Sequence, residues 1–290
     1  MPAASQAWFA GSVAPILGVP ARSGHPLTRN SYGPGLSWPL PADASCAGAA
    51  RGLVRAAWAA LRLPAGRVDD AVLAVSELAA NAWLHALGGE PRRGLARAGG
   101  PRAELWVYRR GTGGAEVVCG VFDPSGDSWS LARLDPAGQR SASRRGAAGR
   151  NDAESGRGLA IVAALSDAAG CRRTRSRLAD DPVAGKVAWF AVEVPGAAVS
   201  PPADITPARA ARTLAMLLTA RGIPAVSHRH RRPARSTVST AAGITVRCQD
   251  GTFEWPAGGT VRLRGFPDLA DVLEDIVWRH EEMRCAPRRA

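Results

Sequence analysis

Three polar side chains recur at intervals of four residues in an otherwise apolar segment. Glu77, Asn81 and His85 lie within residues 71–86, and this spacing places them on one stripe of a single helix with 3.6 residues per turn. A carboxylate can accept a proton, and a carboxamide oxygen suits a hard cation such as Mg²⁺. The stripe therefore predicts a site with a proton acceptor at Glu77 and an oxygen ligand at Asn81.

The alternative for this stripe is an ordinary solvated helix face. The residues around Glu77 and Asn81 are apolar and leave little polar surface: Val72, Val75, Leu78, Ala79 and Ala82. A functional site is therefore the better interpretation for these two residues. For His85 two readings stay open, because an imidazole near a helix C-terminus also interacts favourably with the helix dipole.

Asp123 follows an apolar stretch that predicts a β-strand over residues 116–122. A carboxylate at this strand end can receive a hydrogen bond from the amino group of a bound ring, although before Pro124 it can also begin a simple turn. Gly126 permits a close approach of backbone to ligand. We therefore expect Asp123 and Gly126 to contribute to a binding site.

Gly156 and Gly158 precede a helix that we expect to begin near Gly158. The exposed N–H groups at such a helix start form a natural phosphate cradle, and Arg157 can neutralise phosphate charge. A G-x-G pattern alone is also found in ordinary turns. Residues 156–158 therefore indicate a phosphate site only together with the other candidate segments and their order along the chain.

Hydrophobic periodicity predicts an α+β protein. We expect an edge strand at 37–40 and further strands at 103–108, 116–122 and 186–194, with helices at 46–62 and from about 69 to 87. Residues 124–153 form a long loop rich in Gly, Ser and Arg, and a loop of this length in a compact domain is usually functional or disordered.

The chain divides at a Pro- and Gly-rich segment. We expect a flexible arm over residues 1–33, a main domain over 34–196, a linker over 197–205 and a small domain over 206–285.

The small domain is predicted to be an α-β-β-β-α unit. Thr206 caps its first helix, strands follow at 238–248, 252–255 and 260–263, and a helix over 267–283 closes it. The dipeptide Asp250–Gly251 indicates a hairpin. The basic stretch 228–232 is expected to be a solvated loop.

The bulk composition narrows the class of protein. The chain has 290 residues, 46% of them hydrophobic, with a net charge of +12, and Lys186 is its only lysine. Five separated cysteines without a C-x-x-C pair indicate reduced thiols, and no stretch is apolar enough to span a bilayer, so we expect a soluble cytoplasmic protein. The basic charge suits phosphate or an acidic partner at least as well as nucleic acid, for which the sequence has no recognisable motif.

The order of these segments resembles the GHKL ATPase superfamily, whose Bergerat fold is shared by gyrase and histidine kinases. It is most similar to the anti-sigma-factor serine/threonine kinase branch of short bacterial regulators. The matching segments are residues 75–86 (N box), 121–125 (first glycine box), 156–162 (second glycine box) and 185–190 (final strand). The resemblance covers residues 37–195 and implies a two-layer α/β sandwich, a mixed sheet covered by helices.

The resemblance also implies roles for individual residues. Asn81 would bind the Mg²⁺ of Mg·ATP, Glu77 would act as general base and Asp123 would contact the adenine amino group. Gly156, Arg157 and Gly158 of the second glycine box would lie in the phosphate lid. His85, Gly126 and Leu159 would also belong to the cofactor-binding site.

The expected cofactors are therefore ATP and Mg²⁺. The expected partner is a protein, either an anti-sigma-factor antagonist that is phosphorylated or a sigma factor that is sequestered without catalysis. Dimers are common in this family, so a homodimer is a further expectation. The sequence departs from the family pattern in two places. The first glycine box is shortened at 123–126, and Lys186 or Val187 replaces the threonine that is often found in the final-strand motif.

Overall fold

The computed structural model describes residues 35–60, 64–86, 102–110, 116–125, 152–194, 205–230 and 235–285. These residues form two compact units. The first comprises the described residues of 35–108 and 117–193, and the second comprises 109, 110, 116 and the described residues from 194 onward. The predicted arm at 1–33 lies outside the described residues, and so does the predicted linker except for its last residue.

The first unit contains a five-stranded sheet in the order β1-β2-β3-β5-β4. Its strands are β1 (Leu36–Pro39), β2 (Glu104–Arg110), β3 (Glu116–Asp123), β4 (Ala168–Arg175) and β5 (Ala184–Glu193). β1 pairs antiparallel with β2, and β4 pairs antiparallel with β5. β3 and β5 are nearly continuous runs of apolar and glycine residues, as expected for strands in the middle of a buried sheet.

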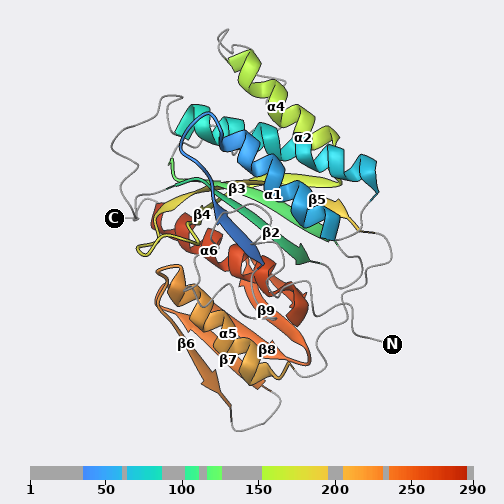
Figure 1. Cartoon of the computed structure of the whole chain (residues 1–290). Coiled ribbons are helices and arrows are strands. Elements are labelled where there is room, and N and C mark those ends of the chain that lie inside the picture. Colours follow the sequence, from blue (N-terminus) through green and yellow to red (C-terminus); the bar gives the residue numbers. More distant parts are fainter. Residues whose placement is uncertain are drawn as a thin grey trace. The chain divides into compact units, whose positions relative to one another are not determined.

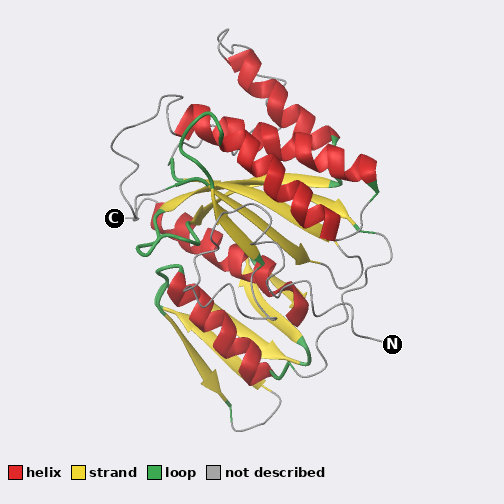
Figure 2. Ribbon diagram, viewed as in Figure 1, coloured by secondary structure: helices red, strands yellow, loops and turns green. Residues whose placement is uncertain are grey.

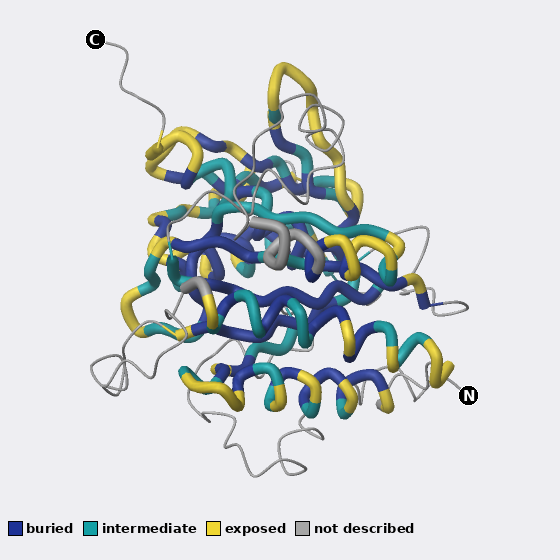
Figure 3. The backbone as a smooth tube through the Cα atoms, turned by 90° about the horizontal axis from the view of Figure 1, so that it is seen from above, coloured by how far each residue is buried: buried dark blue, intermediate teal, exposed yellow. Residues whose placement is uncertain are grey.

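Three helices lie along one face of this sheet (Figure 1): α1 (Cys46–Ala60), α2 (Ala65–Asn81) and α4 (Asp152–Ala164). On α1 the buried residues follow the spacing of a helix that covers a core: Ala50, Leu53, Val54, Ala57 and Trp58. Buried and exposed residues alternate along the helices in Figure 3. The α+β class and the arrangement of helices on a sheet agree with the prediction of a two-layer sandwich.

α2 changes its winding directly after Asn81. Residues Ala82–Ala86 form a π-helical segment, η2, whose hydrogen bonds run from i to i+5 instead of i to i+4. The prediction of one straight α-helical stripe through His85 is therefore wrong, because α geometry ends at Asn81. The stripe is continuous only from Glu77 to Asn81.

Two further predictions in this unit are corrected by the structure. α4 begins at Asp152, so Gly156 and Gly158 lie inside the helix and not in a turn before it. β4 was not predicted, because its sequence of small residues and arginines lacks the usual β-branched pattern and its strand conformation depends on pairing with β5.

The second unit contains a five-stranded antiparallel meander in the order β10-β9-β8-β7-β6. Its strands are β6 (Ala225–Arg229), β7 (Arg235–Thr240), β8 (Thr245–Gln249), β9 (Thr252–Ala257) and β10 (Thr260–Gly265). The helix α5 (Pro207–Ala220) packs against β6, β7 and β8, and it also contacts α6 (Leu269–Cys285), which follows a 3₁₀ turn at Phe266–Asp268 (Figure 2).

Two predictions for this unit are confirmed, the helix cap at Thr206 and the hairpin at Asp250–Gly251. The Thr206 hydroxyl accepts a hydrogen bond from the Arg209 backbone N–H at 3.2 Å and so caps α5. Asp250 and Gly251 have φ angles of 48° and 75°, which is the conformation that a tight two-residue hairpin between β8 and β9 requires.

The prediction of three strands is wrong, since the unit has five. The stretch read as one strand over 238–248 turns back at Gly243, which has a φ of 82°. β6 was missed because it is a short edge strand with an exposed Val226, and its residues His228 and Arg229 had been assigned to a loop.

No helix in the described part of the chain is long and apolar enough to cross a membrane.

Candidate functional site

The candidate site starts from α2, because this helix carries Glu77 and Asn81 on one side. The residues of α2 that point into the core are buried: Ala71, Val72, Ala74, Val75, Leu78 and Ala79. Glu77 and Asn81 are half-buried, between this core face and the exposed Leu73. The apolar face thus anchors the helix and fixes the direction of the two polar side chains.

α1 holds α2 in position through polar contacts as well as apolar packing. The Cys46 thiol donates to the Ala79 carbonyl oxygen at 3.6 Å, and Arg51 Nη1 donates to Ser76 Oγ at 2.9 Å. Burial raises the pKa of the Cys46 thiol to about 11, with a smaller contribution from a nearby carboxylate, so this thiol remains protonated at neutral pH.

α4 approaches α2 closely at Gly158. A Cβ atom on Gly158 would lie 2.7 Å from Glu77 Oε2 and 3.6 Å from Asn81 Nδ2. Gly158 therefore leaves room for the present position of the Glu77 carboxylate and does not serve a turn conformation. The sequence identified the correct glycine for a different physical reason.

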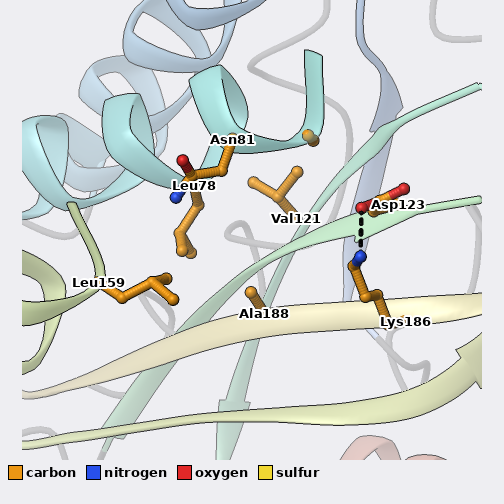
Figure 4. Close-up of a pocket in the computed structure, with 8 residues that line it drawn as sticks. Leu78, Asn81, Val121, Asp123, Leu159, Lys186 and Ala188 are labelled. Atoms are coloured by element: carbon orange, nitrogen blue, oxygen red, sulfur yellow. Dashed lines mark ion pairs between the residues drawn. The ribbon is translucent and has the colours of Figure 1, made fainter. Parts of the chain in front are cut away.

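A pocket lies between α2, α4 and the sheet. Figure 4 shows Leu78 and Asn81 of α2 facing Leu159 of α4 and Val121 of β3 across it. The remaining lining residues are Ala82, Asp123, Lys186 and Ala188. Most of the wall is apolar, and its polar groups are Asn81 on the helix and the pair of charged residues on the strands.

Asp123 and Lys186 form a buried ion pair on the strand side of this pocket (Figure 4). Lys186 Nζ lies 3.0 Å from Asp123 Oδ2, and each side chain is only 7% exposed. Lys186 Nζ also donates to Ser125 Oγ at 3.1 Å, while the Ser125 backbone N–H donates to Asp123 Oδ1 at 2.7 Å. Both carboxylate oxygens of Asp123 thus accept hydrogen bonds from protein groups.

Close contact between β3 and β5 makes this pairing possible. A Cβ on Gly185 would lie 2.3 Å from the Asp123 carbonyl oxygen, and one on Gly120 would lie 2.8 Å from a methyl group of Val187. Both glycines therefore allow the two strands to approach, and this brings Lys186 beside Asp123.

The buried Nδ2 atom of Asn81 has no hydrogen-bond partner among the described residues. A buried amide without a partner costs roughly 1–3 kcal/mol, and rotating the amide would place Oδ1 at the same position. The arrangement therefore suits a ligand that supplies either a cation for the oxygen or an acceptor for the nitrogen.

The structure describes only the backbone of some predicted site residues and does not describe others. The backbone of Gly156 and Arg157 lies in α4, and that of His85 lies in η2. Gly126 lies outside the described residues, as does most of the predicted loop at 124–153. The structure thus gathers Glu77, Asn81, Asp123, Gly158 and Leu159 around one region.

Lys186 is a pocket residue that the sequence motifs do not identify, because it differs from the residue usual in the final-strand motif. Its being the only lysine in the chain is a signal in the sequence that points to it. The apolar wall residues Val121 and Ala188 were also missed, because a strand sequence alone does not show which residues line a cavity.

Comparison with protein families agrees with this geometry. Residues 40–179 match the histidine kinase-like ATPase domain. The matched segment contains α1, α2, β2, β3, α4 and β4, and it includes Glu77, Asn81, Asp123 and Gly158.

This match supports the assignment of the first unit to the GHKL-like ATPases and an ATP-binding regulatory function for this region. It ends before β5, so Lys186 lies outside the matched residues. No curated protein is significantly similar in sequence to this chain.

Proposed function

We propose that this protein is an ATP- and Mg²⁺-binding regulatory kinase of the anti-sigma-factor type. It would transfer the γ-phosphoryl group of ATP to a serine or threonine of a protein partner, such as an anti-sigma-factor antagonist. The main support is that Asn81 and Asp123 line one pocket while Glu77 lies beside it against Gly158.

The chemistry of Asn81 suits the Mg²⁺ of Mg·ATP. Mg²⁺ is usually held by one or two protein oxygens together with substrate phosphates and water, and when bound it neutralises phosphate charge. Among the described residues no cluster of three His, Cys, Asp or Glu side chains could hold a metal alone. Asn81, whose Nδ2 has no hydrogen-bond partner among the described residues and whose amide can rotate, is the residue that would offer an oxygen.

Glu77 would act as the general base. Its carboxylate would accept the hydroxyl proton of the partner's serine or threonine while the hydroxyl oxygen forms a bond to the γ-phosphorus. The bond between that phosphorus and the bridging oxygen would break, and ADP would leave. Positioning of the reactants by the pocket would supply most of the rate enhancement, as is general for phosphoryl transfer.

Two substitutions on α2 test these roles separately. Asn81→Ala should abolish Mg·ATP binding in calorimetric titration. Glu77→Ala should leave binding within about 3-fold of the original protein but reduce transfer of γ-³²P to an anti-sigma-factor antagonist by about 100-fold or more. Leu73→Ala, on the exposed side of the same helix, is the matched control and should change neither quantity. Unchanged phosphate transfer by Glu77→Ala would exclude Glu77 as the base.

A second candidate function is a nucleotide-dependent switch that sequesters a sigma factor without catalysis. The ion pair of Asp123 with Lys186 favours it, because the carboxylate expected to contact the base is already engaged by a protein group. The transfer assay separates the two functions, since the switch would bind Mg·ATP and leave the antagonist unlabelled.

A further inference from the structure

A second pocket lies in the C-terminal unit, between the hairpin of β9 and β10 and the helix α6. Its volume is about 380 Å³, which is within the range of small-molecule sites, roughly 300–1,000 Å³. Its wall is formed by residues of the segments 255–262 and 275–283, and all of them belong to the second unit. The pocket is therefore a property of this unit alone.

One side of α6 faces the hairpin. Its pocket residues recur at intervals of three and four positions and so lie along one stripe of the helix: Asp275, Trp278, Arg279 and Glu282. The core side of the helix is a different one, because it carries the fully buried Ile276 and Val277. The stripe that faces the pocket is therefore not needed to bury the core of the unit.

Indole rings supply most of the apolar wall. Trp255 on β9 is buried, and Trp278 on α6 is half-buried. Trp278 makes no hydrogen bond or ring contact to any described residue. Met283 and Ala257 complete the apolar surface. Such a wall suits an aromatic or aliphatic group, because indole rings offer a large apolar area.

Two of the four charged residues in the pocket satisfy each other, since Arg262 and Asp275 form an ion pair. The other two, Arg279 and Glu282, form no ion pair or hydrogen bond with any described residue. They lie three positions apart on α6, and side chains at this spacing are neighbours, about 5–6 Å apart at Cβ. One cation and one anion thus lie side by side at the apolar wall.

Solvated charges on a helix surface are the alternative explanation for these two residues. Arg284, farther along α6 and outside the pocket, is exposed as this explanation requires. Arg279 is half-buried in a wall that contains the buried Trp255. A charge that is partly removed from water without a counter-charge is costly, so an anionic ligand group at Arg279 would be stabilising.

We propose that this pocket binds a free amino acid with an apolar or aromatic side chain. Arg279 would donate hydrogen bonds to the α-carboxylate, and Glu282 would accept one from the α-ammonium group. The ligand's side chain would lie against Trp255 and Trp278. In a free amino acid both charged groups are attached to one carbon, so they can face two neighbouring side chains of one helix at once. In a peptide they lie at opposite ends of the chain.

The test is calorimetric titration of the full chain with L-phenylalanine, L-tryptophan, L-leucine and glycine. At least one of the first three should bind, and glycine, which has no side chain, should not. The amide of the amino acid that binds lacks the carboxylate and should bind about 10- to 100-fold more weakly, because charged hydrogen bonds are lost. Its N-acetyl derivative lacks the ammonium group and should bind about 2- to 5-fold more weakly, because Glu282 is exposed.

Arg279→Gln assigns the carboxylate contact to one residue. It should weaken binding of the free amino acid by about 10- to 100-fold, and the free amino acid and its amide should then bind within about 2-fold of each other. Arg284→Gln makes the same change on the same helix outside the pocket and should leave binding unchanged. Urea denaturation checks that both variants are folded, and the comparison of the derivatives needs only the original protein.

Absence of binding of all three amino acids by the original protein, or equal binding of the amide, would overturn this inference. An N-acetyl derivative that bound as tightly as the free amino acid would overturn it in favour of a simple carboxylate ligand. The inference does not rest on the proposed ATP site. Mg·ATP binding by Arg279→Gln should equal that of the original protein, so either proposal can fail without the other.

Discussion

Gly158→Ala gives a sharp test of the contact between α4 and α2. The added methyl group would lie 2.7 Å from Glu77 Oε2, whereas ordinary contact begins at 3.4 Å, so the carboxylate has to retreat by about 0.7 Å. The obstacle is the end of a flexible, half-buried side chain and not backbone, so the carboxylate can move at low energetic cost.

The expected effect on stability is small or favourable. Alanine is better than glycine inside a helix by about 0.8–1.0 kcal/mol, which offsets the cost of moving Glu77. Turnover should respond very differently, because a displacement of a catalytic group by about 1 Å can cost about 100-fold in rate. Mg·ATP binding should change little, since the methyl group would lie 3.6 Å from Asn81, an ordinary contact distance.

The assay combines urea denaturation, calorimetric titration with Mg·ATP and the rate of γ-phosphate transfer. Gly66→Ala is the matched control, because Gly66 lies in the first turn of α2 and a Cβ there meets no atom within 4 Å. It should leave binding and transfer unchanged. If Gly158→Ala transferred phosphate at the original rate while remaining folded, the assignment of Glu77 as a positioned base would be refuted.

Three further predictions concern the framework of the two units. Arg221→Met removes the guanidinium that contacts the buried Glu274 carboxylate at 2.7 Å and should lower the free energy of unfolding by about 3–5 kcal/mol in urea titrations, whereas replacing both residues by apolar ones should recover most of the loss. Gly185→Ala should be strongly destabilising in the same assay, because its methyl group would lie 2.3 Å from the backbone carbonyl oxygen of Asp123, which cannot swing aside. Burial raises the pKa of the Cys46 thiol from its ordinary value of 9.0 to about 11, so the folded state keeps this proton at pH values where the unfolded state has lost it. The resulting contribution to stability is complete below pH 9 and is lost as the pH rises towards 11. The fall in unfolding free energy at alkaline pH should therefore be smaller in Cys46→Ala.

Local chemistry explains which parts of the fold could be predicted. The Thr206 cap and the hairpin at Asp250–Gly251 depend on a side chain and a backbone preference within a few residues, so the sequence is sufficient to identify them. The core face of α1 likewise follows from apolar spacing within one helix.

The elements that were missed depend on contacts between distant segments. β4 carries Arg172, Arg173 and Arg175, and it becomes a strand because β5 supplies a pairing partner along its whole length. The start of α4 differs from the prediction because a glycine pair usually indicates a turn, whereas Gly158 lies inside a helix beside the Glu77 carboxylate.

In the candidate site, too, local features could be predicted and contacts between distant segments could not. The stripe of Glu77 and Asn81 follows from helical spacing within one element and could be predicted. The pairing of Lys186 with Asp123 depends on how β5 is placed beside β3, which a sequence alone does not specify. The sequence alone therefore does not place Lys186 in the pocket.

The polar groups of the pocket should contribute differently to nucleotide binding. The Asn81 amide has no partner among the described residues, so a ligand group that reaches it removes an existing penalty of roughly 1–3 kcal/mol and adds directly to affinity. Asp123 already accepts hydrogen bonds from Lys186 and from the Ser125 backbone N–H, so a ligand group that reached this carboxylate would share or replace existing bonds and gain less net affinity. Removing the Asn81 amide should therefore weaken Mg·ATP binding more than removing the Asp123 carboxylate, and calorimetric titration of Asn81→Ala and Asp123→Asn compares the two losses.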